Sequence, residues 1–183
     1  NGGTFVGYPE GTIINETKDI INVPTEYNEK IVPPVSPERK NFSFAGWEPT
    51  VGIMDSTETK TFNAKWAECY YTVKTYTMNT LGEYEVAETK YPATPGDQID
   101  ISESLNNAGE GLYGEAGKSD CKGVVKADNS LVLTLYFARN KYRLTFDAGE
   151  GFFTDGKHIK TDLYYHGSVM PDYVPFRIGY NFV

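Results

Sequence analysis

The side chains of this sequence that could do chemistry match no known catalytic spacing. His158 and His166 accompany neither a GxSxG nucleophile motif nor an HExxH metal motif. Cys69 and Cys121 belong to no CxxC pair that could hold zinc or exchange disulfides. Their spacing is compatible with a disulfide bond or with two buried free thiols, and we favour the thiols. We therefore expect no catalytic residue, no metal site and no cofactor.

An acidic group near the middle of the chain is the other candidate for metal binding. Asp97, Asp100 and Glu103 lie close together in the sequence, but their spacing does not match the calcium-binding loop of an EF-hand. We interpret this group as a solvated turn.

Aromatic residues offer a second kind of chemistry, because an aromatic ring can stack on the apolar face of a sugar. Trp47 and Trp66 are candidates for such a platform. In a small β unit, however, aromatic residues at strand spacing mostly bury large apolar areas, so we favour a core role. Tyr113 lies in a glycine-rich stretch, residues 105–123, which could form a binding loop. It is our candidate ligand-binding residue.

The charge of the chain restricts its partners. The net charge is −8, and the 17 basic residues are spread singly along the sequence. Binding to nucleic acid needs clustered lysine and arginine to displace counterions, so we expect no nucleic acid partner. No apolar stretch is long enough to span a membrane, and we expect no membrane insertion in this segment.

The sequence contains an internal repeat, and the strands that position these residues are expected to follow it. Five aromatic or proline pairs share one offset of 138 positions, which is hard to obtain by chance. The pairs are Tyr27 and Tyr165, Pro33 and Pro171, Pro37 and Pro175, Phe42 and Tyr180, and Phe44 and Phe182. Residues 1–5 also match residues 149–153.

Alternating apolar and polar residues predict a mainly β fold with little helix. Leu133, Leu135 and Phe137 share one face of a strand whose other face is also largely apolar, which predicts a central strand. Only one helical turn is expected, over residues 36–39, with Ser36 as its cap and Pro37 at its first position. Residues 105–123 hold five glycines and predict irregular structure. The strands we expect cover residues 19–23, 42–47, 61–66, 70–79, 84–91, 131–137 and 142–146.

The repeat divides the chain into three units with very short joints. The first unit is 1–68 and lacks an initial strand, and the middle unit is 69–140. The third, 141–183, is the front part of a second copy of the first unit. Joints this short predict units that stack semi-rigidly. The incomplete outer units also predict head-to-tail self-association, because open strand edges invite pairing between chains.

The outer units resemble the internalin-type B repeat, also called the Listeria–Bacteroides repeat. The motifs that carry this resemblance occur in order along the chain. They are Asn-Gly-Gly-Thr-Phe at 1–5, Phe-Ser-Phe-Ala-Gly-Trp at 42–47 and Ala-Lys-Trp at 64–66, followed in the second copy by Thr-Phe-Asp-Ala at 145–148 and Gly-Tyr-Asn-Phe-Val at 179–183. The middle unit resembles a MucBP-like (mucin-binding-protein-like) repeat, on Tyr-Thr-Val at 71–73 and Leu-Tyr-Phe-Ala-Arg-Asn at 135–140.

This resemblance implies tandem β-grasp (ubiquitin-like) units, making the fold a β-rich α+β type. It also implies a location outside the cell, on the surface of a bacterium, often a Gram-positive or gut species, or secreted from it. It brings no catalytic residues. We therefore expect a non-enzymatic spacer, stalk or adhesin segment whose partners include neighbouring repeats of the same protein. The alternative is an adhesive module centred on 69–140 that binds host mucin, glycan or a surface protein. A third hypothesis is an accessory region of a secreted hydrolase.

Overall fold

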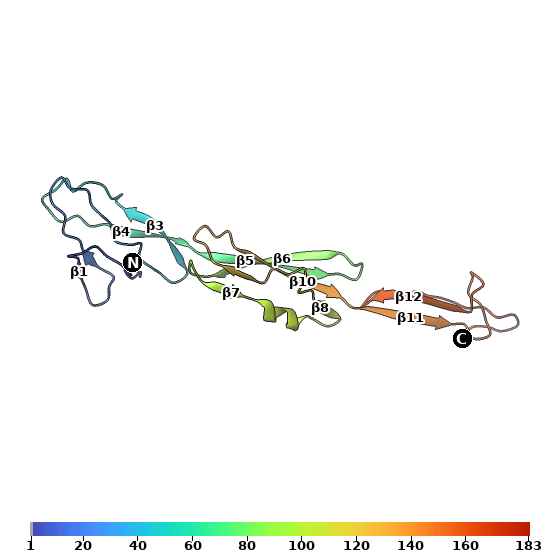
Figure 1. Cartoon of the computed structure of the whole chain (residues 1–183). Helices are drawn as coiled ribbons and strands as arrows, with labels where there is room; N and C mark the ends of the chain where they lie inside the picture. Colours follow the sequence, from blue (N-terminus) through green and yellow to red (C-terminus); the bar gives the residue numbers. More distant parts are fainter. Residues whose placement is uncertain (1) are drawn as a thin grey trace. The chain divides into compact units, whose positions relative to one another are not determined.

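The computed structural model describes residues 2–183, so Asn1 of the predicted 1–5 motif lies outside the described residues. The fold is mainly β with little helix, as predicted (Figure 1). Its helix is the 3-10 segment η1 (Ser102–Asn107). The strands are β1 (Ile13–Ile14), β2 (Ile21–Asn22), β3 (Phe42–Glu48), β4 (Asn63–Glu68), β5 (Tyr70–Met78), β6 (Tyr84–Pro92), β7 (Gln98–Asp100), β8 (Leu112–Gly114), β9 (Lys122–Val124), β10 (Val132–Arg139), β11 (Lys141–Asp147) and β12 (Ile159–Tyr165). The β-grasp character of the units stays a prediction.

One four-stranded sheet and several strand pairs make up this architecture. The sheet has the order β6-β5-β10-β8, and the pairs are β1-β2, β3-β4, β7-β9 and β11-β12. Strand β10 lies between β5 and β8, which confirms the prediction of a central strand from its two apolar faces. Its residues Leu133, Leu135 and Phe137 are all buried.

The chain forms two compact units. Unit 1 comprises Asn1–Val73, Thr89–Asp100 and Lys122–Leu133, and unit 2 comprises Lys74–Glu88, Ile101–Cys121 and Thr134–Val183. Strands β5, β6 and β10 therefore contribute residues to both units. The division into repeats at 68 and 140 is a different one, based on sequence, and it stays a prediction.

Each unit has its own buried residues. In unit 1, Cys69, Ala93 and Val125 form a cluster against which Tyr71, Ile99 and Leu131 pack. In unit 2 the buried apolar side chains include Leu135, Phe137, Ala138 and Phe153. These small cores come from short apolar stretches that are far apart in the sequence.

The helical turn expected at 36–39 is wrong. Glu38 instead pairs with Thr4, and each residue donates its N–H to the carbonyl of the other at 2.8 Å. Arg39 and Phe42 then close a tight turn through Asn41, which has a φ of 65°. The cap and proline signals are local, and the pairing of two distant backbone segments overrides them.

The same backbone contacts recur in 141–183, which we call the last copy. Phe176 pairs with Phe152 through two hydrogen bonds of 2.8 Å, and Arg177 and Tyr180 form a bridge. The turn passes through Gly179, with a φ of 81°. Each arginine also lies over the ring that follows it, Arg39 over Phe42 at 4.0 Å and Arg177 over Tyr180 at 4.1 Å.

The irregular structure expected for 105–123 is also partly wrong. This stretch contains the end of η1, the strand β8 and the start of β9. A Cβ on Gly114 would lie 2.6 Å from the carbonyl oxygen of Leu105, so η1 approaches β8 closely only because residue 114 is glycine. A glycine that favours a loop in isolation here permits close packing of a strand.

Candidate functional site

Tyr113 lies at the edge of a shallow pocket in unit 2. It is in β8 opposite Ala138 of β10, and 49% of its surface is exposed. The pocket has a volume of about 260 Å³. Its lining comes from four separate parts of the chain: Met78, Tyr113, Glu115, Ala138, Arg139, Lys141 and Tyr165.

Two cations and a second tyrosine accompany Tyr113. The guanidinium of Arg139 is fixed by donating Nε to Met78 O at 3.1 Å and Nη1 to His166 O at 3.0 Å. Lys141 Nζ lies 4.4 Å from the centre of the Tyr165 ring. A tyrosine face can stack on a sugar ring, and a cationic group beside it can attract a carboxylate. Tyr113 was a candidate from the sequence, whereas Arg139, Lys141 and Tyr165 reach this pocket through distant pairings.

A fixed carboxylate, that of Glu115, also lines the pocket. The Tyr84 hydroxyl donates to Glu115, and Lys118 Nζ lies 3.0 Å from the same carboxylate. These two hydrogen bonds, from Tyr84 first and then from Lys118, lower the pKa of Glu115 despite its partial burial. Glu115 is therefore ionised at neutral pH, so the pocket presents charges of both signs.

The two tryptophans pack within the first unit. Trp47 stacks on Phe5 at 6.0 Å, and Phe44 meets Trp47 and Trp66 edge-on at 5.1 Å and 6.0 Å. Both tryptophans are half-buried. This packing agrees with the core role that we favoured over a sugar-stacking platform.

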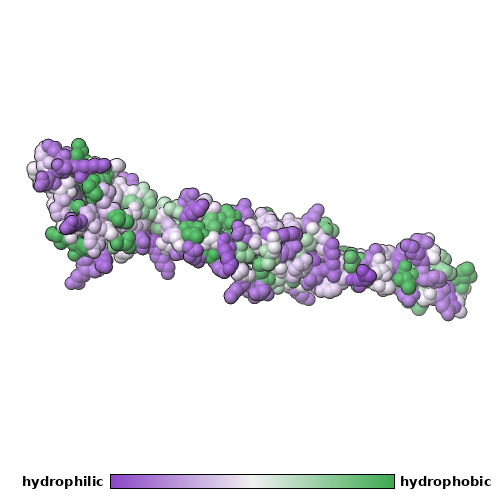
Figure 2. All heavy atoms as spheres, viewed as in Figure 1, coloured by the Kyte–Doolittle hydropathy of each residue, from purple (hydrophilic) through white to green (hydrophobic). Residues whose placement is uncertain are grey.

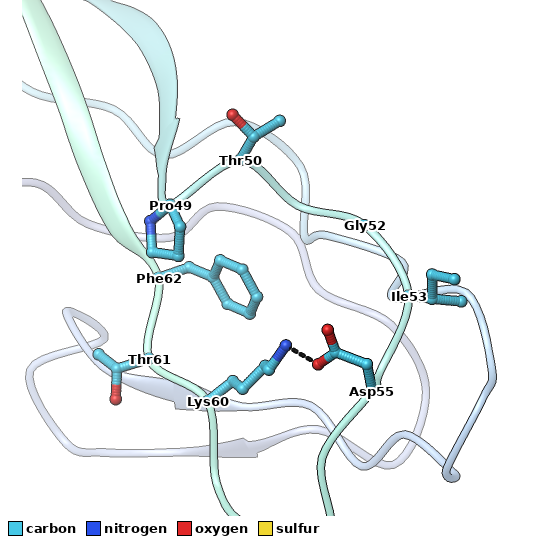
Figure 3. A pocket seen from close by; sticks show the side chains of 8 residues that line it. All are labelled: Pro49, Thr50, Gly52, Ile53, Asp55, Lys60, Thr61 and Phe62. Atoms are coloured by element: carbon cyan, nitrogen blue, oxygen red, sulfur yellow. Dashed lines mark hydrogen bonds and ion pairs between the residues drawn. The ribbon is translucent and has the colours of Figure 1, made fainter.

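A second pocket lies within the connection between β3 and β4. It has a volume of about 280 Å³ and is lined by residues between Pro49 and Phe62. Figure 3 shows Phe62 pointing into the space that this connection encloses, beside the ion pair of Lys60 and Asp55. That ion pair already satisfies the charges here, so the pocket offers little to a polar ligand.

The remaining candidates from the sequence take part in ordinary packing. The His158 ring lies 4.6 Å from Phe152, and His166 lies 6.0 Å from Tyr142. Both cysteines are buried, and neither is part of a disulfide bond. Burial, helped by the nearby Asp97 charge, raises the pKa of Cys69, which favours the unreactive thiol form.

The acidic group at 97–103 is held by local contacts. Asp97 accepts a hydrogen bond of 2.8 Å from the Thr94 N–H, and Asp100 forms an ion pair of 2.8 Å with Lys122. Between residues 2 and 183, no three His, Cys, Asp or Glu side chains are arranged to hold a metal ion. No helix within this described range is long and apolar enough to cross a membrane.

The first joint between predicted units is a single residue, Cys69, which separates β4 from β5. Cys69 donates its N–H to Asn41 O at 3.1 Å and accepts from Ala93 N–H at 3.0 Å. The Asn129 side chain spans the joint, accepting from Tyr70 N–H at 3.0 Å and donating to Glu68 O at 3.1 Å. Both backbone groups of Cys69 are thus held, and the peptides on either side are tied together.

The second joint is Asn140, which separates β10 from β11. Asn140 donates its N–H to Gly111 O and accepts from His166 N–H, both at 2.8 Å. Arg139, beside it, holds the carbonyls of Met78 and His166 together. Nothing in the sequence indicated that Asn129 and Arg139 would make these contacts at the two predicted joints.

Comparison with known proteins finds no match for this chain among family models, curated proteins or solved structures.

Proposed function

We propose that this chain is a non-enzymatic repeat region of a bacterial cell-surface or secreted protein, acting as a spacer or stalk within an adhesin. The observation that carries the proposal is the construction of the joints. Cys69 and Asn140 each connect two strands through one residue, and both backbone groups of each are hydrogen-bonded. A spacer needs joints that resist bending, whereas a flexible linker leaves its backbone to water.

The recurrence of backbone contacts in the first unit and the last copy supports the repeat on which this proposal depends. The pairings Thr4–Glu38 and Phe152–Phe176 occupy matching positions in the two copies. Length in a repeat protein comes from stacking similar units, each of which buries a modest core. The proposal includes the resemblance to B repeats and to a MucBP-like repeat. It also includes the location outside the cell.

The spacer proposal predicts that Asn129 stiffens the first joint. In Asn129→Gly we expect amide exchange at Tyr70 to accelerate by about tenfold, because the side-chain hydrogen bonds, worth about 1 kcal/mol each, are lost. Glycine tolerates the φ of 59° that Asn129 adopts, so the backbone turn is preserved. The measurements are hydrogen exchange and 15N relaxation of the joint.

Asn28→Gly is the matched control, because Asn28 has a similar φ of 66° but lies away from the joint. It should leave exchange at Tyr70 unchanged. Nanosecond motion at Cys69 and Asn140 in the unmodified chain, comparable to that of a free loop, would overturn the spacer proposal.

A second candidate function is binding of mucin or another glycan by the segment 69–140. The half-exposed Tyr113 beside Lys141 and Tyr165 favours it. If this pocket binds sugar, Tyr113→Ala should weaken binding at least about fivefold, since loss of ring stacking costs about 1 kcal/mol or more. Binding of the chain to immobilised mucin and a glycan panel, at low and physiological salt, measures this.

Tyr27→Ala is the control for that experiment, because Tyr27 is 60% exposed but belongs to the first unit. Absence of binding at high micromolar protein would reject the glycan hypothesis and leave the spacer proposal standing. Equal weakening by both variants would show that the contact is not made at the Tyr113 pocket.

A further inference from the structure

The pocket that Tyr113 lines lies on one face of the four-stranded sheet. Tyr113 pairs with Ala138, and two positions away Glu115 donates its N–H to Tyr136 O at 2.8 Å. Side chains two residues apart in extended backbone point to the same face, so Tyr136 shares a face with the pocket-lining Ala138 and Tyr113. The Tyr136 ring stacks on that of Tyr76, with the ring centres 4.3 Å apart. The pocket therefore lies on a tyrosine-rich face of the sheet.

The charges that line this pocket do not balance. The carboxylate of Glu115 is compensated, because it accepts a hydrogen bond from the Tyr84 hydroxyl and forms an ion pair of 3.0 Å with Lys118. The two cations of the lining, Arg139 and Lys141, are not compensated: between residues 2 and 183, neither forms an ion pair with a carboxylate. The pocket therefore has an excess of positive charge on a chain whose net charge is −8.

Arg139 is held in place and still has hydrogen-bond donors to offer. A guanidinium has five N–H groups. Within the described residues Arg139 uses two of them, on Met78 O and His166 O. These two hydrogen bonds fix the plane of the group, so its other donors are oriented before a ligand arrives. A planar guanidinium can donate two parallel hydrogen bonds to the oxygens of an anionic group.

Lys141 is positioned by an aromatic ring. Its Nζ lies 4.4 Å from the centre of the Tyr165 ring. That ring packs against Gly82, where an added Cβ would come within 2.7–2.9 Å of its atoms. The Tyr165 side chain therefore has little room to move. A cation held beside a fixed ring loses little freedom when a ligand binds, which favours affinity.

The size and lining of the pocket favour a single sugar ring with a charged group. Its volume of about 260 Å³ is at the small end for ligand pockets. Tyr113 is 49% exposed and offers a ring face on which a pyranose can stack. Figure 2 shows hydrophobic patches interspersed with hydrophilic residues on the visible face of the chain. What distinguishes this pocket is thus the combination of an exposed ring with two uncompensated cations.

We propose that this pocket binds an acidic sugar, meaning one pyranose ring that bears a carboxylate or a sulfate group. The ring stacks on Tyr113, and the anionic group is held by Arg139 and Lys141. Glu115 accepts hydrogen bonds from hydroxyl groups of the sugar. This inference rests on the second candidate function, glycan binding, and names the class of glycan.

Three methyl glycosides that share one ring test the role of the anionic group. They are methyl glucuronide, which has a carboxylate, methyl glucoside, which is neutral, and methyl glucoside carrying a sulfate ester. Each is titrated into the whole chain at constant ionic strength while the amide resonances of β8 and of residues 138–141 are followed. At least one anionic sugar should bind at least about tenfold more tightly than methyl glucoside, because hydrogen bonds between charged groups are the strong ones. Sodium sulfate should bind more weakly than that sugar, because it has no ring to stack.

Lys141→Gln removes the charge and nearly keeps the length of the side chain. It should reduce the preference for the anionic sugar at least about fivefold and leave the binding of methyl glucoside nearly unchanged. Lys141→Arg keeps the charge and should keep the preference. Lys40→Gln is the matched control, since Lys40 is also exposed but lies in the first unit. It should leave the affinities for all three sugars unchanged.

Equal binding of the neutral and anionic sugars, or a preference that survives in Lys141→Gln, overturns the inference. Sodium sulfate that binds as tightly as the sugars overturns it too, as does lack of binding by all three sugars at high millimolar concentration. If the chain still binds immobilised mucin or glycans in those cases, the glycan hypothesis stands without this inference. Absence of binding to any glycan rejects both. The spacer proposal is unaffected, because it rests on the joints.

Discussion

Replacing Leu133 with alanine is expected to lower the free energy of unfolding of unit 1 by about 2–5 kcal/mol. Leu133 is 0% exposed and lies in β10, the central strand. The substitution removes buried apolar atoms and leaves a cavity that a close-packed core refills only in part. No other large side chain of the described residues is as completely buried.

Denaturation by urea, combined with amide hydrogen exchange, measures the Leu133→Ala effect. The N–H of Thr72, which donates to Leu131 O at 3.0 Å, reports on the same region. Its protection should fall by at least about 30-fold, since each 1.4 kcal/mol corresponds to a factor of ten.

Leu81→Ala is the matched control, because it makes the same chemical change in a turn where the side chain is 79% exposed. It should cost less than about 0.5 kcal/mol. A similar cost for both variants would mean that Leu133 is not the centre of the core that its burial indicates.

Local patterns in the sequence were sufficient to predict the strands β3, β4, β5, β6, β10 and β11, but not β8, β9 or β12. Alternation of apolar residues in 70–79 and 131–137 anticipated β5 and β10, because a pleated strand turns successive side chains to opposite faces. Two apolar faces in β10 placed it inside a sheet, since both faces of such a strand must be covered. These predictions hold because each depends only on residues within one strand.

Predictions failed where distant backbone segments meet. The capping signals at Ser36 and Pro37 favour a helical turn, but two hydrogen bonds to Thr4 hold Glu38 extended. The glycines at 114 and 123 suggested a loop, but they lie in β8 and β9. Glycine permits a tight turn, and it also permits another segment of the chain to approach closely. Which of the two occurs depends on the neighbouring segment, so the glycine alone does not predict it.

The candidate site was predictable only in part for the same reason. Tyr113 was identified from its position in a glycine-rich stretch, and it does line a pocket. Lys141 and Tyr165 reach that pocket through the pairing of β11 with β12, and Glu115 is oriented by Tyr84, 31 residues away. Likewise, nothing near Asn129 in the sequence indicates that its amide spans the joint at Cys69.

Adding a methyl group at Gly3 or at Gly151 is expected to disrupt the two copies in the same way. A Cβ at Gly3 would collide with the Trp66 ring and lie 3.2 Å from Glu38 O. At Gly151 it would lie 2.8 Å from Phe176 O, the equivalent carbonyl in the last copy. Overpacking of this kind costs about 1–3 kcal/mol, because the neighbouring backbone must move.

The paired hydrogen bonds beside each glycine give a local readout of this cost. Gly3→Ala should accelerate amide exchange at Thr4 and Glu38, and Gly151→Ala should accelerate it at Phe152 and Phe176, by about 5- to 100-fold. Each variant should leave the other copy unchanged.

Gly52→Ala and Gly117→Ala are the controls, since neither position has a heavy atom within 4 Å of an added Cβ. Both controls should leave these four amides protected. If one glycine tolerates alanine and the other does not, the matching bridges in the two copies have arisen from different packing. The two copies would then share a sequence pattern and a backbone path, but not the same packing around the glycine. If both variants fail alike, the same steric constraint acts in the first unit and the last copy, as stacking of similar units requires.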